Sequence, residues 1–361
     1  MNPSQFLALI VAQFAGIVTG VTTRLNGRIE GPLAYLHKTM LAVEYSVSGK
    51  WESFFADNTQ VAADIVAMDS PLPLKKRDSL GRASGDIPKQ GQERQLNERE
   101  LTDLGVLRAQ QGTQNVIIQR IFADTPKVIS AIYERNEACF LEGLSTGMCV
   151  VSDANNVGAG VRLDFGYPTS NKFGAASVVW SNVASTPIDD IRRMVQAASD
   201  KGESIIRLMM DRTAFANMAK TTQVKEQYAF FANGSVGQVL ATPSLSKVND
   251  YLTDELLPNI QIIDRSVRVE RDGVQTAYKP WADGAVVGIT SEQVGKLVYA
   301  RLAEQDSPVA GVTYTEADSY ILVSKFSVNR PSLAEFTQSQ ARVIPVISTS
   351  VYLLDSKTVQ A

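Results

Sequence analysis

Cysteine and histidine are scarce in this chain of 361 residues. It holds two cysteines, Cys139 and Cys149, and a single histidine, His37. So few cysteines fit a reduced compartment better than a disulfide-stapled secreted protein. The cysteines lack CxxC spacing, and one histidine adds little to a ligand set, so the sequence argues against a zinc site.

The chain also lacks an excess of charge of either sign. It has 35 Lys and Arg against 38 Asp and Glu, which gives a net charge of −3. Tight wrapping of nucleic acid would require a strong basic excess, so we expect only non-specific contact with DNA. Hydrophobic residues make up 44%, enough for a substantial core, and the length favours two lobes.

An uninterrupted apolar run of membrane-spanning length is missing as well. The most apolar stretch, 6–21, is broken by polar and glycine residues from Gln13 onward, and a span needs about 20 consecutive apolar residues. The first basic residue, Arg24, follows this stretch, whereas a secretory signal carries its basic residues before it. We therefore expect a helix or arm that packs on the body or on a neighbouring subunit, and no membrane partner.

Recognisable catalytic motifs are nearly absent. The sequence GLSTG at 143–147 fits the GxSxG pattern of serine hydrolases. A nucleophile elbow needs a strand before the serine, however, and here Gly147 closes a predicted helix. A triad would also need a histidine after Ser145, and the only histidine precedes it. We expect no enzyme activity, no catalytic residue, no cofactor and no metal, with a hydrolase as a remote alternative.

A densely charged segment occupies 71–112. Its apolar residues are isolated among turn-forming and charged ones, so it cannot bury enough apolar surface to order itself. Loops this long are either functional or disordered. The segment is thus either an extended hairpin ordered by neighbouring subunits or a flexible linker. The hairpin interpretation makes these residues contacts between subunits: Lys75, Lys76, Arg77, Arg82, Lys89, Glu98, Arg99 and Glu100.

Helix and strand signals are mixed along the rest of the chain. Thr125-Pro126 predicts the start of a long helix over 125–146, and Thr186-Pro187 the start of a second that ends before Gly202. Asp211 predicts the cap of a third. Strands are expected at 161–165, 175–180, 205–210, in a β-meander over 260–289, and at 319–328 and 341–354 around a turn at 329–332. Helices and strands do not alternate strictly, which favours an α+β fold.

Several short motifs, in order, resemble one known family. The run RDSLGRASGDIPK at 77–89, continuing to LNEREL at 96–101, resembles the extended loop of the lambda-type phage major capsid protein E family. Later landmarks fit the same order: Asn136-Glu137-Ala138 with LSTG at 144–147, Asp164-Phe165-Gly166, Trp180, TPIDDI at 186–191, Asp272-Gly273, PWADG at 280–284 and QARVIPV at 340–346. The resemblance covers about 70–350, and the N-terminal apolar stretch has no counterpart in it.

This resemblance implies the HK97-like capsid fold. Its parts would be an N-terminal arm with adjoining segments (1–67), an extended E-loop (68–112), a peripheral domain (113–182 and 310–345) with a spine helix at about 125–146, and an axial domain (183–309 and 346–361). Arg330, in the turn at 329–332, would lie where capsomers join.

The implied function is that of a major capsid protein. Copies would form hexamers and pentamers that close an icosahedral head around double-stranded DNA of a tailed bacteriophage. They would assemble in the host cytoplasm with scaffolding, portal and possible decoration proteins, and would end in the virion capsid. The alternatives are an encapsulin-like protein shell, a phage tail or adhesin component, and the hydrolase.

Overall fold

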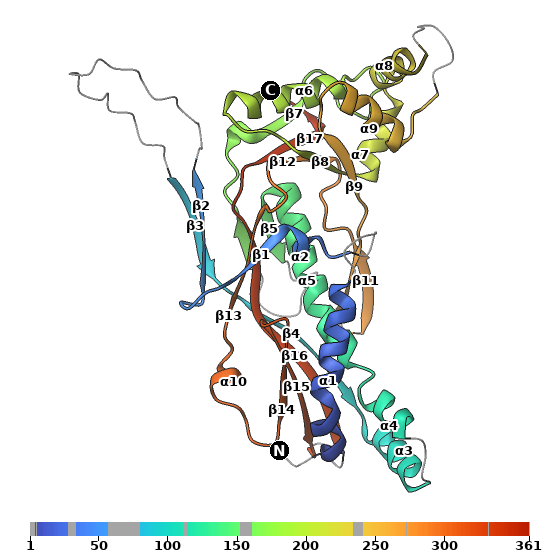
Figure 1. Ribbon diagram of the computed structural model, residues 1–361, viewed down its shortest axis with the longest axis vertical. Coiled ribbons are helices and arrows are strands. Elements are labelled where there is room, and N and C mark those ends of the chain that lie inside the picture. The colour runs from blue at the N-terminus through green and yellow to red at the C-terminus, as the bar shows by residue number, and fades with distance from the viewer. Residues whose placement is uncertain are drawn as a thin grey trace, which may run out of the picture. The chain divides into compact units, whose positions relative to one another are not determined.

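The computed structural model describes residues 4, 6–27, 34–56, 80–110, 114–151, 161–233, 241–271, 273–330 and 332–360. The chain forms two compact units, each assembled from segments far apart in sequence (Figure 1). The first unit comprises Met1–Trp51, Gly85–Cys139 and Lys296–Val346. The second comprises Glu52–Ser84, Phe140–Gly295 and Ile347–Ala361.

A six-stranded sheet with helices packed on it forms the first unit. The strands follow the order β1 (Leu41–Tyr45), β13 (Gly295–Ala300), β16 (Ala334–Ile347), β15 (Ile321–Val328) and β14 (Thr313–Ala317), and β4 (Lys89–Leu96) also pairs with β16. The helices are α1 (Leu7–Asn26), α2 (Leu36–Met40), α3 (Glu98–Ala109), α4 (Gln114–Ile121), α5 (Thr125–Thr146) and α10 (Ala303–Asp306). The last turns of α5 and the last residue of β16 belong to the second unit.

Helix α5 confirms the predicted span of 125–146. Its inward row, which includes Val128, Ile129, Ile132 and Tyr133, is fully buried. Gly147 follows the helix with φ of +81°, the left-handed conformation that glycine adopts without steric cost. The apolar residues Val116 to Ile121, which precede α5, belong to the separate short helix α4.

The N-terminal apolar stretch is helix α1, whose inward row is buried: Ile10, Phe14, Val18, Val21 and Leu25. The ring of Phe14 stacks on that of Phe122 with centroids 6.1 Å apart. The expectation that this stretch forms a helix packed on the rest of the subunit is confirmed for the buried face of α1. By length and hydropathy alone, α1 could also cross a membrane.

Part of the charged segment is ordered by the chain itself. Strand β4 pairs antiparallel with β16 from Lys89↔Arg342 to Leu96↔Glu335. The expectation that 71–112 cannot order itself is therefore wrong for 89–109, because β16 supplies main-chain partners that need no apolar side chains. Glycine is required in this ladder: a Cβ at Gly91 would lie 2.4 Å from the carbonyl oxygen of Ser339.

Helix α3 follows β4 directly and starts with a capping box. Asn97 Oδ1 accepts the Glu100 N–H at 3.0 Å, and Glu100 Oε2 accepts the Asn97 N–H at 2.9 Å. Leu101 and Leu104 are buried beneath the helix. Residues 71–79 lie outside the described residues.

The second unit contains a five-stranded sheet covered by helices. The strand order is β7 (Lys172–Ala175), β17 (Val351–Val359), β12 (Ala285–Ile289), β8 (Arg207–Asp211) and β9 (Asn259–Ile263). The helices are α6 (Pro187–Asp200), α7 (Arg212–Lys220), α8 (Thr222–Asn233) and α9 (Leu245–Asp254), with a 3-10 turn at Thr169–Asn171. Three two-stranded sheets complete the described strands: β2 (Lys50–Ala56) with β3 (Leu80–Asp86), β5 (Met148–Val151) with β6 (Val161–Asp164), and β10 (Val267–Arg271) with β11 (Val274–Tyr278).

The local helix signals of this unit are confirmed. Helix α6 starts with Pro187 and carries two aspartates in its first turn, and Asp211 caps α7 by accepting two backbone N–H groups. The predicted strand at 175–180 is wrong beyond Ala175. Instead Asp190, buried in α6, accepts the Ala176 N–H at 2.8 Å and the Trp180 Nε1–H at 2.9 Å.

Two strand predictions are wrong about strand pairing or continuity, although the residues concerned do form strands. Gly273 and Gly284 have the positive φ that tight turns require, but 260–289 is not a meander. Strand β9 pairs parallel with β8. Strand β12 pairs antiparallel with β8 and β17. Strand β8 therefore lies between β9 and β12. The single strand predicted at 341–354 is likewise two strands, because β16 ends at Ile347 and β17 begins at Val351.

Candidate assembly surface

Four of the residues predicted to contact neighbouring subunits come together in the first unit. Leu96 at the end of β4 pairs with Glu335 near the start of β16. The residues after Leu96 begin α3, and the residues before β16 form the β15–β16 turn. The start of α3, with Glu98, Arg99 and Glu100, therefore lies near the β15–β16 turn, which also carries Arg330.

The start of α3 and the β15–β16 turn form a surface hollow of about 620 Å³. Its lining residues are Asn97, Glu98, Arg99, Thr102 and Ser332. Glu98, Arg99 and Arg330 are exposed. In the described part of the chain the side chains of Arg99 and Arg330 have no ion-pair partner, so both guanidinium groups are available to another molecule. We call the hollow together with Arg330 the α3–turn surface.

Glu100 and Lys89 also have partners within the chain. Glu100 caps its own helix through the Asn97 N–H, so its carboxylate is already used within the chain. Lys89 lies at the opposite end of β4 from the α3–turn surface and is paired with Glu304, Nζ to Oε1 at 3.7 Å. Arg82 belongs to β3, and Lys75, Lys76 and Arg77 lie outside the described residues.

A buried ion pair stands directly behind this surface. Lys325 Nζ lies 3.2 Å from Glu335 Oε1, with both side chains closed to solvent. Lys325 also donates to the Ile121 carbonyl and the Thr337 hydroxyl, each at 3.0 Å, and Ser4 Oγ donates to Glu335 Oε2 at 2.7 Å. Burial lowers the pKa of Lys325, although the nearby Glu335 acts in the opposite direction. These contacts fix the β15–β16 hairpin to α4.

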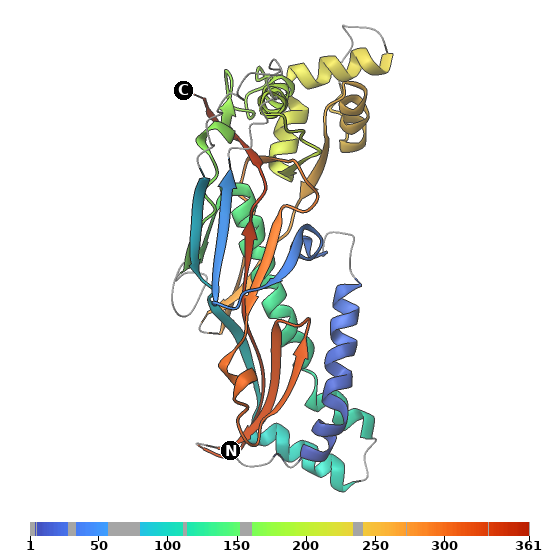
Figure 2. The same cartoon turned by 60° about the vertical axis from the view of Figure 1, so that its left-hand side comes forward.

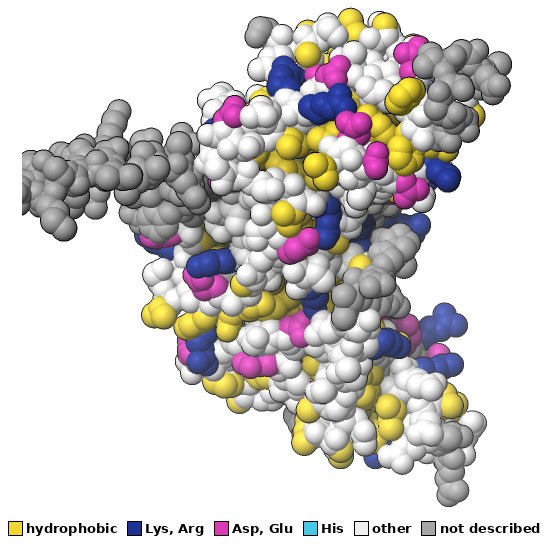
Figure 3. All heavy atoms as spheres, turned by 45° about the horizontal axis from the view of Figure 1, so that its top comes forward, with side chains coloured by type: hydrophobic (Ala, Val, Ile, Leu, Met, Phe, Trp, Pro, Cys, Tyr) yellow, Lys and Arg dark blue, Asp and Glu magenta, His cyan; other side chains and the backbone are white. Residues whose placement is uncertain are grey.

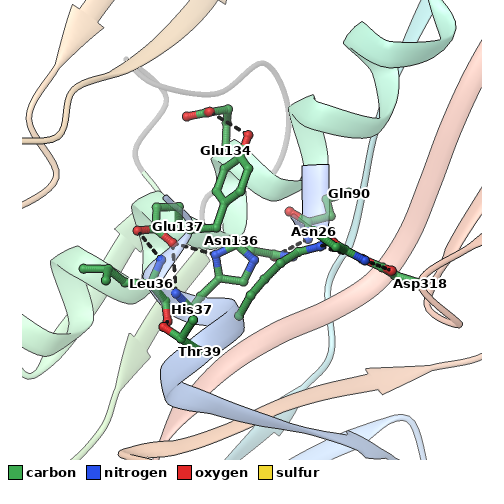
Figure 4. A network of polar contacts seen from close by, with 11 residues as sticks. Asn26, Leu36, His37, Thr39, Gln90, Glu134, Asn136, Glu137 and Asp318 are labelled. Atoms are coloured by element: carbon green, nitrogen blue, oxygen red, sulfur yellow. Dashed lines mark hydrogen bonds and ion pairs between the residues drawn. The ribbon is translucent and has the colours of Figure 1, made fainter. Parts of the chain in front are cut away.

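A second polar network fixes the N-terminal elements of the first unit (Figure 4). The carboxylate of Glu137 in α5 accepts the backbone N–H groups of Leu36 and His37, each at 3.0 Å, and lies 2.6 Å from His37 Nδ1. Both side chains are fully buried. The only histidine of the chain therefore positions α2 on α5.

Asp318, in the turn between β14 and β15, is the centre of the same network. It binds Lys38 Nζ at 2.5 Å and the Asn26 amide at 2.7 Å, and it accepts a hydrogen bond from the Tyr133 hydroxyl. Burial alone would raise the pKa of Asp318, but the hydrogen bonds outweigh it and lower the pKa. For Lys38 burial dominates, and its pKa is lowered despite Asp318. The network ties the end of α1 to the sheet.

The residues considered as candidates for catalysis or metal binding have structural roles. Ser145 lies inside α5, where its Oγ donates to the Leu141 carbonyl at 2.8 Å and accepts the Ala282 N–H at 2.9 Å. A nucleophile elbow is therefore not formed there. Cys139 and Cys149 are disulfide-bonded, contrary to the expectation of reduced thiols. Among the described residues no three His, Cys, Asp or Glu side chains form a group that could hold a metal.

Family comparison decides among the interpretations left open by the sequence. Residues 53–347 match the model of the family described as phage major capsid protein E. The chain belongs to this family. It is a major capsid protein, and this family points to a structural role rather than to an enzyme. No curated protein sequence matches the chain.

Solved structures of phage and prophage proteins share the fold of this family member. A putative capsid protein of a prophage from E. coli CFT073 is 12% identical, covers 94% of this chain and 98% of its own, and has a TM-score of 0.58. A phage-related protein from Bordetella bronchiseptica RB50 is 14% identical, covers 94% and 96%, and has a TM-score of 0.52. The capsid protein of cyanophage A-1(L) is 10% identical, covers 91% and 93%, and has a TM-score of 0.50. The fold is the α+β, HK97-like capsid fold.

Sequence reasoning missed several of the interactions that build this surface. Asn97 and Glu100 carried a visible signal, because Asn-x-x-Glu before an apolar helix row is the pattern of a capping box. Lys325 and Glu335 carried none, since nothing in a single sequence marks two charged residues as buried partners.

Proposed function

We propose that this major capsid protein self-assembles into hexamers and pentamers that close an icosahedral head around the double-stranded DNA of a tailed bacteriophage. Assembly takes place in the host cytoplasm, with scaffolding and portal proteins and possible decoration proteins as partners. Contact with DNA is non-specific, in keeping with the net charge of −3. The face drawn in Figure 3 also carries basic and acidic side chains interspersed rather than a basic stripe.

The parts of the fold receive capsid names as part of this proposal. Strands β2 and β3, which run side by side as a two-stranded ribbon (Figure 2), are the base of the extended E-loop. Helix α5 is the spine helix of the peripheral domain, which comprises most of the first unit, and the five-stranded sheet of the second unit with its helices is the axial domain. The E-loop then ends before β4, earlier than residue 112.

The α3–turn surface is the observation that carries the proposal. It presents the exposed carboxylate of Glu98 next to the exposed guanidinium of Arg99, and the adjoining β15–β16 turn carries the exposed Arg330. A planar guanidinium can bind a carboxylate of another copy through two parallel hydrogen bonds. The buried Lys325–Glu335 pair holds the hairpin behind it, so the groups are preorganised for a repeated contact between copies.

Substitution of Arg330 by Glu tests this contact. Arg330 is exposed and unpaired in the described part of the chain, so Arg330→Glu should change the free energy of unfolding by no more than about 0.5 kcal/mol. Like charge would repeat at each symmetry-related contact, and we expect no closed shells by negative-stain microscopy of the purified protein, alone and with its neighbouring genes co-expressed.

Lys247→Glu is the matched control for Arg330→Glu. It changes the charge by the same amount at an exposed position in the first turn of α9, where an acidic residue suits the helix dipole. This variant should form shells like the wild type. Shells of normal yield from Arg330→Glu would show that the α3–turn surface is not a joint, whereas the absence of any shell from the wild type would contradict self-assembly itself.

A further inference from the structure

Strand β11 has an edge whose main-chain groups are unused. In the described part of the chain β11 pairs only with β10, in the register Arg271↔Val274, Val269↔Thr276 and Val267↔Tyr278. Two residues connect the strands, so Arg271 and Val274 exchange main-chain hydrogen bonds, and such pairs recur at every second residue. Gln275 and Ala277 consequently direct their N–H and C=O groups away from β10.

Strand β10 anchors this hairpin, whereas β11 is exposed. Val267 and Val269 of β10 are 3% and 8% exposed, but every residue of β11 from Val274 to Ala277 is exposed, with Val274 at 64%. The hairpin is thus fixed to its unit through one strand. The other strand has both its side chains and its outer edge in solvent.

Nothing on β11 blocks the addition of another strand. Natural edge strands are protected by charged side chains, proline or bulges, and β4 follows this rule with Lys89, Glu93 and Arg94. The sequence of β11, Val-Gln-Thr-Ala-Tyr, has no charge and no proline, and its register with β10 has no bulge. An edge of this kind is complementary to a second extended chain.

We propose that β11 accepts a strand from a second copy of this chain, which adds to the β10–β11 hairpin through the main-chain groups of Gln275 and Ala277. This inference rests on the proposed self-assembly and names one further contact within it. Two-stranded sheets are marginal in water, and a third strand gives the hairpin the cooperative pairing that it lacks.

The chemistry of the edge favours a protein strand of the same chain. A phosphate backbone would need basic side chains, and β11 has none. Main-chain donors and acceptors at every second residue match only another extended polypeptide. The chain also has strands to offer, because β2 and β3 pair only with each other in the described part of the molecule. A donor strand on one copy and an acceptor edge on the next give a head-to-tail contact that can close into a ring.

Amide hydrogen exchange on the wild-type protein tests the inference at single residues. In the free subunit the amides of Gln275 and Ala277 should exchange rapidly, and that of Thr276, which is bonded to β10, should be protected. In shells we expect exchange at Gln275 and Ala277 to slow at least tenfold. Exchange as fast in shells as in free subunits would overturn the inference, as would protection that appears only when DNA or another protein is added.

The shell yield of an Ala277→Pro variant tests whether the edge of β11 takes part in assembly. Ala277→Pro removes an N–H that points away from β10 and leaves the bonds of Thr276 in place, as proline does on natural edge strands. The variant should fold but yield at least tenfold fewer shells, while Ala277→Ser, which keeps the N–H, should assemble normally. A normal shell yield from Ala277→Pro would overturn strand addition. If Ala277→Pro does not fold, the exchange experiment decides. A wild type that forms no shells would instead reject the proposed function.

Discussion

Lys325 and Glu335 form an ion pair, Nζ to Oε1 at 3.2 Å, in which neither side chain reaches solvent. The pair joins β15 to β16 immediately behind the turn that carries Arg330. Ser4 hydrogen-bonds the same carboxylate, and the Ile121 carbonyl accepts from the same ammonium group. Three distant parts of the chain, at Ser4, at Ile121 and in the β15–β16 hairpin, therefore depend on one pair of opposite charges.

Removal of one charge from this pair should destabilise the protein strongly. Lys325→Met leaves Glu335 as an uncompensated buried carboxylate, and a loss of this kind costs about 3–5 kcal/mol. The double variant Lys325→Met with Glu335→Leu removes both charges and should lose less stability than Lys325→Met alone. Chemical denaturation followed by circular dichroism measures each free energy of unfolding. A loss below about 1 kcal/mol in Lys325→Met would contradict the role of this pair.

The Asp318 network should make stability depend on pH in the acid range. The pKa of Asp318 is lower in the folded protein than its ordinary value, so the folded state binds fewer protons at this carboxyl than the unfolded state. Its contribution is present above the unfolded value of about 3.9 and is lost as the pH falls through the folded value. The difference in melting temperature between wild type and Asp318→Asn should be largest at neutral pH and should shrink below about pH 4.

Asp264→Asn provides the control for this pH series. Hydrogen bonds from Lys279 and Arg212 lower the pKa of Asp264 as well, but those partners are exposed on the surface. Solvent and salt screen such contacts, so Asp264→Asn should follow the wild type closely at every pH. A gap for Asp318→Asn that stays constant down to pH 2 would show that its carboxylate does not stabilise the fold.

Trypsin should distinguish the two halves of the charged segment. In the unassembled protein we expect cleavage after Lys75, Lys76 or Arg77, because their sequence context is too polar to order itself. Arg94, in the ladder between β4 and β16, should resist cleavage and serve as the internal control. In shells the cuts at 75–77 should be suppressed by neighbouring subunits. Mass spectrometry of the fragments locates the sites, and equal protection before and after assembly would contradict the prediction.

The features that the sequence predicted well are governed by neighbouring residues. Helices α5 and α6 begin at or next to a proline and end just before a glycine, although neither Thr125 nor Thr186 forms a side-chain capping bond, and those signals act over a few residues. The turns at Gly273 and Gly284 are likewise local, since each depends on one glycine with positive φ. Which strands pair across those turns is a non-local choice, and there the predicted meander failed, since β8 inserts between β9 and β12.

The candidate site also has parts that local sequence predicts and parts that depend on non-local pairing. Glu98, Arg99 and Arg330 could be named as contact residues from charge and turn chemistry. Their convergence could not, because it depends on Leu96 lying opposite Glu335, a pairing across more than two hundred residues. Strand β4 was missed for a related reason: its sequence is almost entirely polar, and its order comes from the main chain of β16.

The register between β4 and β16 determines where α3 begins. One inserted or deleted residue between Lys89 and Leu96 would shift α3 by about 3.3 Å and turn the following side chains to the opposite face of the sheet. A shift of one residue would also place a residue with a Cβ at the position of Gly91, where it would collide with the main chain of Ser339. Changes in length are therefore expected to be tolerated on the N-terminal side of Lys89 but not within the eight residues that follow.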